Sequence, residues 1–78
     1  MRRAKNFSDI AETFSKLSAR QQEVIALVCD GLSNREIAEE LNVTEGAVKI
    51  HLHAIYEKLG IQSRTELIIA LAMSALDR

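Results

Sequence analysis

A serine followed three residues later by Gln or Glu occurs at three places and divides the chain into short segments. In this pattern, the capping box, the two side chains satisfy free backbone N–H groups at a helix start. The three pairs are Ser18 with Gln21, Ser33 with Glu36, and Ser63 with Glu66. Thr44 supplies a further N-cap, while Gly31 and Gly60 can adopt the left-handed conformation that ends a helix. These signals predict helices over residues 19–30, 34–41, 45–59 and 64–76.

The rest of the sequence agrees with a helical protein. It contains no proline and three glycines, and no segment alternates apolar and polar residues as a half-buried strand does. The predicted fold class is therefore all-α, a four-helix bundle, with residues 17–78 as its one domain. Residues 1–16 are predicted to be an N-terminal tail or linker. In the alternative, Ile10, Phe14 and Leu17 belong to a short helix that covers the core.

The charge of the chain is close to balanced, although free-standing nucleic-acid binders are often basic. The net charge is −1 and the pI is about 6.1. Segment 41–64 is slightly positive and also holds both histidines; its charged residues are Lys49, Lys58, Arg64, Glu45 and Glu57. A chain of 78 residues buries too little surface for a deep active site, and no catalytic constellation is visible in the sequence. An enzyme is therefore not expected.

Composition predicts a cytoplasmic protein without a membrane partner. Hydrophobic residues make up 47% and charged residues 27%, with no apolar run that could span a bilayer and no signal peptide. The single cysteine, Cys29, lies in the apolar stretch VIALVC and is predicted to be a buried small hydrophobic residue. His51 and His53 diverge on a helix and have no cysteine partners at ligand spacing, so no metal or cofactor is predicted.

The third predicted helix has two contrasting faces. At about 100° per residue, one stripe must face the core; it consists of Val48, Leu52, Ile55 and Leu59. The opposite stripe consists of Gly46, Ile50, His53 and Glu57, with Lys49 at its edge. Its N-terminal part, called the outer stripe below, is formed by Gly46, Lys49, Ile50 and His53. A short helix, a three-residue connection and a longer helix form the geometry that offers a helix to the major groove. An exposed isoleucine could contact a thymine methyl group there, and a lysine a guanine or phosphate; the alternative is an ordinary solvated face.

The motifs EVIALV, GLSNREIAEEL, VKIH, KLGI and SRTEL follow one another within residues 17 to about 70. In this order they resemble the LuxR-type (GerE/NarL/FixJ) DNA-binding domain. The resemblance implies a four-helix domain of the LuxR/NarL C-terminal effector type, with its helix-turn-helix placing the third helix in the major groove. Such a domain is usually the output of a response regulator or a signal-binding regulator, and the short chain with its charged start suggests a part of a longer regulator.

The resemblance also implies particular contacts with double-stranded DNA. The expected base-reading residues are Lys49, Ile50 and His53, with Gly46 allowing close backbone approach. The expected phosphate contacts are Asn34, Thr44, Glu45, Lys58 and Arg64. Asn42 stands where the family often has glycine, and His53 where some relatives have lysine. The sequence preference of those relatives therefore cannot be transferred to this chain.

The fourth predicted helix is apolar on nearly every face and needs a second burial partner. In the resembling family this helix forms the dimer contact, which predicts a homodimer interface of Thr65, Ile68, Ile69, Ala72 and Met73. With few cations in each subunit, useful affinity is expected only for a dimer on an inverted-repeat operator. The alternative is that the N-terminal segment with Ile10 and Phe14 covers the helix.

Two other functions remain open from the sequence. The motifs EIAEEL and TEGAVK also resemble region 4 of a sigma factor, although KLGI followed by a capped fourth helix favours the LuxR type. The second alternative is a helical protein-interaction module that does not bind DNA. RNA polymerase is a further candidate partner in the transcription regulator interpretation.

Overall fold

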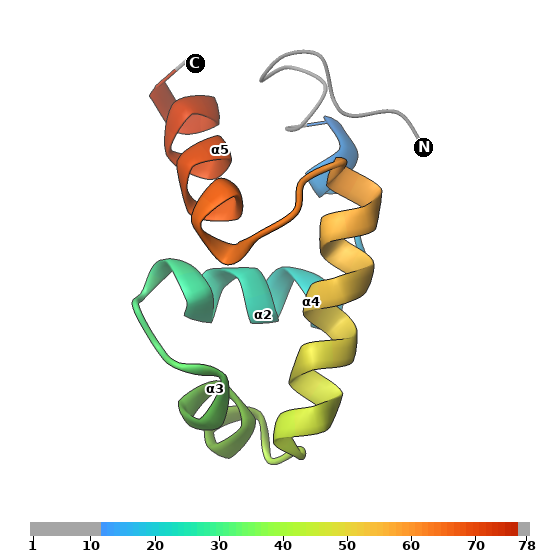
Figure 1. The fold of residues 1–78 in the computed structure, drawn as a ribbon, viewed down its shortest axis with the longest axis vertical. Coiled ribbons are helices and arrows are strands. Elements are labelled where there is room, and N and C mark those ends of the chain that lie inside the picture. The colour runs from blue at the N-terminus through green and yellow to red at the C-terminus, as the bar shows by residue number, and fades with distance from the viewer. Residues whose placement is uncertain (1–11, 77–78) are drawn as a thin grey trace.

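The computed structural model describes the backbone of residues 12–76 and the side chains of residues 12–73 (Figure 1). Its helices are α2 (Ala19–Cys29), α3 (Asn34–Leu41), α4 (Glu45–Leu59) and α5 (Arg64–Leu76). Residues 12–15 add a helical turn, and the described part of the chain contains no strand. The all-α prediction is therefore confirmed. Only the end of α2 differs from the predicted bounds, because Asp30 is the C-cap and not a helical residue.

The N-terminal ends of the helices are capped as the serine and threonine spacing predicts. Both hydrogen bonds of the capping box are present at the start of α2 and at the start of α3. At α4, the Thr44 hydroxyl accepts a hydrogen bond from the backbone N–H of Ala47 at 3.0 Å. At α5, the Ser63 hydroxyl accepts from the backbone N–H of Glu66 at 3.2 Å. Each cap satisfies an N–H that the helix itself leaves free.

The first three helices end in the same way, through one residue with positive φ. These residues are Gly31 (φ 88°), Asn42 (φ 58°) and Gly60 (φ 70°). The next residue is apolar in each case and returns its N–H to a carbonyl in the last helical turn, as in the Schellman motif. The three hydrogen bonds join Leu32 to Leu27, Val43 to Ala38, and Ile61 to Tyr56. Asn42 thus takes the left-handed conformation that glycine would supply.

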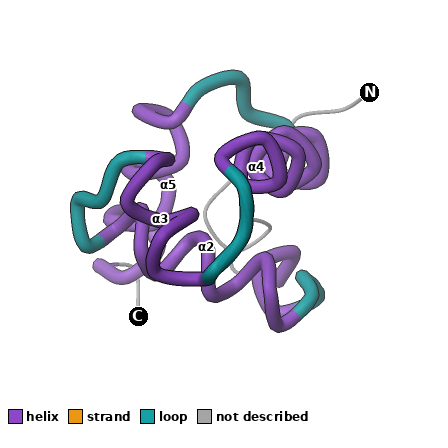
Figure 2. The backbone as a smooth tube through the Cα atoms, turned by 90° about the horizontal axis from the view of Figure 1, so that it is seen from below, coloured by secondary structure: helices purple, strands orange, loops and turns teal. Residues whose placement is uncertain are grey.

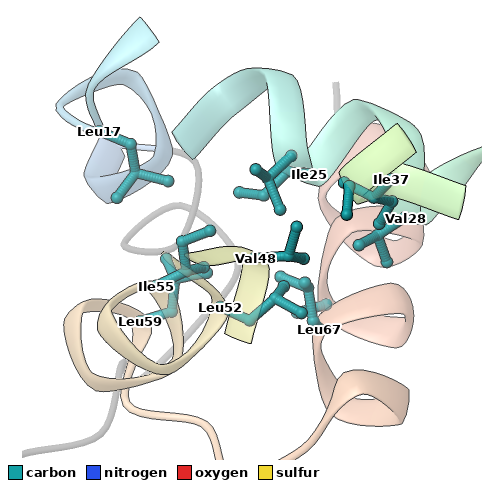
Figure 3. Packing of buried hydrophobic residues seen from close by; sticks show 12 residues of the cluster. Leu17, Ile25, Val28, Ile37, Val48, Leu52, Ile55, Leu59 and Leu67 are labelled. Carbon is teal, nitrogen blue, oxygen red and sulfur yellow. The ribbon is translucent and has the colours of Figure 1, made fainter. Parts of the chain in front are cut away.

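One apolar core joins the helices (Figure 3). The predicted core stripe of α4 is buried throughout: Val48, Leu52, Ile55 and Leu59 are each 4% exposed or less. Their side chains meet those of α2, α3 and α5; the labelled partners in Figure 3 include Ile25, Val28, Ile37 and Leu67. The 3.6-residue period of apolar positions therefore predicted the buried face of α4 correctly.

The helices cross steeply around this core. In Figure 1, α4 runs vertically and α2 horizontally, and in Figure 2, seen from below, α4 is viewed along its axis while α2 lies across the view. The helix backbones pack against each other most extensively in the pairs α3 with α4, α2 with α4, and α2 with α3. The packing is that of crossed helices around one core, and α5 joins it chiefly through its buried side chains.

The segment before α2 is attached to the core. Leu17 is 5% exposed, and Phe14 packs against the core cluster from the helical turn of residues 12–15. The side-chain amide of Gln22 donates hydrogen bonds to the backbone carbonyls of Phe14 and Leu17, each at 3.2 Å. Ile10, which the alternative prediction placed in the same short helix, lies outside the described residues.

The prediction for Cys29 was wrong, because its side chain is exposed. The buried residues of α2 are Gln21, Val24, Ile25 and Val28. At about 100° per residue, Cys29 lies about 90° from the middle of that stripe, and it is the last residue of the helix. An apolar stretch of sequence is therefore not enough to bury its final residue.

Candidate nucleic-acid interface

The surface formed by α3 and α4 is built on a tight turn of residues 42–44. In Figure 2 this turn, drawn as a teal loop, faces the viewer and connects the two helices. The left-handed Asn42 ends α3, Val43 packs against the core, and Thr44 caps α4. The turn is therefore held by its backbone and by core contacts. The outward side chains in the N-terminal half of α4 are not needed to hold the turn and are available to a partner.

The outer stripe is exposed along its whole length. Gly46, Lys49, Ile50 and His53 are all exposed, and 72% of the Ile50 surface is accessible. His51, which is not part of this stripe, is half-buried. The predicted orientation of α4 is thereby confirmed. The helix presents an apolar side chain, an amine and an imidazole on one accessible face.

Gly46 leaves the backbone of α4 uncovered near its start. A Cβ atom built at this position would meet only the Thr44 hydroxyl oxygen, at 3.9 Å, an ordinary van der Waals contact. Glycine is therefore not required by the packing of the protein. Because glycine also weakens a helix, its presence here fits a requirement for close approach by another molecule.

Lys49 is free of ion pairs with any residue from 12 to 73. The cation nearest in sequence on the preceding helix, Arg35, is paired with Glu39 at 3.6 Å. An exposed ammonium group that is not engaged in an ion pair can bind a phosphate or a base acceptor without first losing a partner. Lys49 is thus the cation of this face best suited to a contact outside the protein.

The residues expected to contact phosphate fall into two groups. Thr44, Glu45 and Lys58 are exposed, whereas Asn34 and Arg64 are half-buried. The hydroxyl of Thr44 already accepts the capping hydrogen bond. The ammonium group of Lys58 lies 3.5 Å from the amide oxygen of Gln21, the one buried polar side chain between residues 12 and 73. Thr44 and Lys58 therefore each make a hydrogen bond within the protein and are also accessible from outside.

Asn34 and Arg64 contact each other directly. A terminal guanidinium nitrogen of Arg64 donates to the Asn34 side-chain oxygen at 3.0 Å, and the other donates to the backbone carbonyl of Leu32. This pairing is not visible in the sequence, because the partners of Arg64 are 30 and 32 positions away from it. The two residues were expected only as separate phosphate contacts, and the structure brings them together within the protein.

Burial and charge affect the titration of two groups near these helices. Burial raises the pKa of the Tyr56 phenol, while the positive charge of Arg64 lowers it. Burial also raises the pKa of the Cys29 thiol, and the neighbouring Asp30 carboxylate raises it further. Neither group is in the outer stripe.

A second exposed face lies on α5. The accessible residues are those predicted for the dimer contact: Thr65, Ile68, Ile69, Ala72 and Met73. Ile68 is 42%, Ile69 55% and Met73 40% exposed, while Leu67 and Ala70 are buried in the core. The described N-terminal segment leaves this apolar face uncovered. Such a patch is typical of a surface that binds another protein.

The described residues form neither a metal site nor a membrane-spanning helix. Between residues 12 and 73, no group of three or more His, Cys, Asp or Glu side chains is arranged to hold a metal ion. Among the described helices, none is long and apolar enough to cross a membrane. The outer stripe and the apolar face of α5 remain the two candidate binding surfaces.

The fold and the exposed α4 define a helix-turn-helix protein. Residues 15–71 match the family model described as bacterial regulatory proteins, luxR family. The chain belongs to this family, and it therefore contains a DNA-binding domain of transcription regulators and not an enzyme. The match also decides between LuxR type and sigma factor region 4 in favour of the former.

Individual relatives agree with this assignment. The two-component response regulator PprB of Pseudomonas aeruginosa is 42% identical over 65 residues, which are 83% of this chain and 24% of that protein. The response regulator TodT of Pseudomonas putida is 35% identical over 65 residues, 83% of this chain and 29% of the relative. A solved structure of the response regulator StyR matches with a TM-score of 0.76 and 36% identity, covering 85% of this chain and 33% of that one. The chain thus spans about a quarter to a third of these relatives.

Proposed function

We propose that this chain is the output domain of a bacterial two-component response regulator and binds an inverted-repeat operator as a homodimer. The relatives support this proposal, because several are response regulators and all three described above are much longer than this chain. Residues 17–78 are the DNA-binding unit in this proposal. The protein acts in the cytoplasm, where its DNA is, and RNA polymerase is a further candidate partner.

The observation that carries the proposal is the exposure of Ile50. An isoleucine with 72% of its surface accessible gains little from folding. In the major groove it would contact a thymine methyl group, while Lys49 and His53 on the same face reach base acceptors. Gly46 would let the start of α4 lie against the DNA. In this proposal α4 is the recognition helix, and its N-terminal half carries the base contacts.

Contacts with the phosphates of the DNA backbone position this helix in the proposal. The phosphate-contacting residues in the proposal are Asn34, Thr44, Glu45, Lys58 and Arg64. Glu45 contributes through the backbone N–H at the positive end of α4, since its carboxylate would repel a phosphate. Arg64 contributes only through N–H groups that its two internal hydrogen bonds leave free.

Dimerisation through α5 compensates for the small charge of each subunit. The net charge of the chain is −1, so the electrostatic part of the affinity of one subunit is weak. Burying Ile68, Ile69 and Met73 against a second copy would remove apolar surface from water and place two recognition helices on two half-sites. The proposed interface also includes Thr65 and Ala72.

The test is binding-site selection with the purified domain, followed by gel shifts on the selected sequence. Lys49→Ala combined with His53→Ala should abolish specific binding while leaving the helical circular dichroism spectrum unchanged, because both side chains are exposed. The matched control is Lys16→Ala, which removes an exposed cation from the segment before α2. Intact specific binding by the double variant would contradict the assignment of α4 to the groove.

A further inference from the structure

Arg64, the first residue of α5, reaches back to the beginning of α3. Its guanidinium donates to the carbonyl of Leu32 and to the side-chain oxygen of Asn34, the latter at 3.0 Å. Leu32 lies in the turn between α2 and α3, and Asn34 is the first residue of α3. Both neighbours of Ser33, the N-cap of α3, are thus held by one planar group. The start of α3 is thereby fixed from outside as well as by its own capping box.

This link matters because it adds a directional contact to the apolar contacts that hold α5. The most extensive backbone packing is among α2, α3 and α4, and α5 joins them through buried side chains such as Leu67 and Ala70. Apolar burial is non-directional and permits small rotations of a helix. A guanidinium with two hydrogen bonds is planar and directional, so it restricts the orientation of α5 relative to α3.

Arg64 also acts on the charge balance of a half-buried residue of α4. Burial raises the pKa of the Tyr56 phenol, and the positive charge of Arg64 opposes that rise. The hydrogen bonds of Arg64 itself reach the turn before α3 and the first residue of α3. A change of orientation at α5 would therefore be transmitted through this group to the start of the helix-turn-helix.

We propose that Arg64 is a positioning residue that holds α5 in a fixed orientation relative to the helix-turn-helix and so sets the spacing of the two recognition helices in a dimer. The inference rests on the proposed function, in which α5 is the dimer helix. Two of the five guanidinium N–H groups are used within the protein. The competing role is a phosphate contact alone, made by the remaining N–H groups.

Salt dependence separates the two roles. Arg64→Lys keeps the charge, but one ammonium group cannot reproduce the planar two-pronged contact. The affinity of Arg64→Lys for the selected inverted repeat should fall about tenfold, while the slope of log affinity against log salt concentration stays unchanged. Its affinity for a single half-site should stay near that of the unaltered protein. The matched control is Lys58→Ala, which should reduce the slope by about one. Unaltered affinity in Arg64→Lys, with a slope reduced by about one in Arg64→Ala, would overturn the proposal.

A second experiment needs no DNA. Urea unfolding of Arg64→Ala, Asn34→Ala and the double variant measures how far the two effects depend on each other. The change in the unfolding equilibrium constant of the double variant should differ about tenfold from the product of the two single changes. If Arg64→Ala does not fold, Arg64→Lys replaces it. Hydrogen exchange is then measured on Arg64→Lys, and the backbone amides at the start of α3 should exchange faster than in the unaltered domain. Additive effects and unchanged exchange would overturn the positioning role. Absence of DNA binding by the unaltered domain would instead contradict the proposed function.

Discussion

Val48 and Ile50 lie two residues apart on α4 and face opposite environments: Val48 is 0% exposed and Ile50 is 72% exposed. On a helix, positions two apart point in directions about 160° different, so one must face away when the other is in the core. The two residues are both β-branched and apolar. They therefore offer a matched pair for separating the contribution of α4 to folding from its contribution to DNA recognition.

Ile50→Ala should leave the free energy of unfolding within about 0.5 kcal/mol of its original value, because little apolar surface is buried there. Its affinity for the selected operator should fall about fivefold to tenfold, with relaxed preference at one base pair. Val48→Ala is the control and should destabilise the fold by about 2 kcal/mol. Urea unfolding and gel shifts measure the two effects, and equal loss of stability in both variants would contradict the assignment.

Gly46→Ala should stabilise the domain and weaken its binding to DNA. The added Cβ meets only the Thr44 hydroxyl oxygen at 3.9 Å, and alanine in a helix is favoured over glycine by about 0.5–1 kcal/mol. The same methyl group would keep the backbone from the DNA. Thermal unfolding should show the gain in stability, and operator titration on the same preparation should show the loss of affinity. Unchanged affinity would show that α4 does not approach DNA at this point.

Gly31→Ala should have the opposite effect on stability. Nothing lies within 4 Å of the added Cβ, so the change acts only through the backbone, whose φ of +88° disfavours alanine. A cost of about 1–2 kcal/mol is expected. Comparing its denaturant midpoint with that of Gly46→Ala tests whether positive φ, and not glycine as such, is required at the end of α2.

Ile69→Glu should prevent dimer formation without unfolding the domain, because the side chain is 55% exposed on α5. Sedimentation should show a monomer, with affinity lowered for an inverted repeat and little changed for a half-site. The matched control is Ala26→Glu, which places the same charge at an exposed position of α2. Dimers that persist in Ile69→Glu would rule out this face as the interface.

The Cys29 thiol should react slowly for an exposed cysteine at neutral pH. Burial and the Asp30 carboxylate raise its pKa, which lowers the thiolate fraction at any given pH. Disulfide reagents should therefore modify the folded domain with a pH profile displaced upward from that of the urea-unfolded chain, and Asp30→Asn should reduce the displacement. The associated stability is present below the thiol pKa of the unfolded chain and is lost as pH rises through that of the folded state.

The structural roles that could be predicted from the sequence are those that depend on residues nearby in the sequence. Ser18, Ser33 and Thr44 cap helices through hydrogen bonds to residues three positions away. The core stripe of α4 follows from the helical period, which also places the outer stripe in solvent. Element bounds and the orientation of α4 were therefore predictable before any tertiary contact was known.

Cys29 and Arg64 mark the limit of this local information. The sequence around Cys29 is apolar, yet the side chain is exposed because the core lies against another face of α2. Arg64 looks from the sequence like an available cation, but its partners are 30 and 32 residues earlier in the chain. The sequence by itself determined the helices, their caps and the two faces of α4. Only the tertiary structure decided which side chains meet across helices, because that depends on how the helices cross around one core.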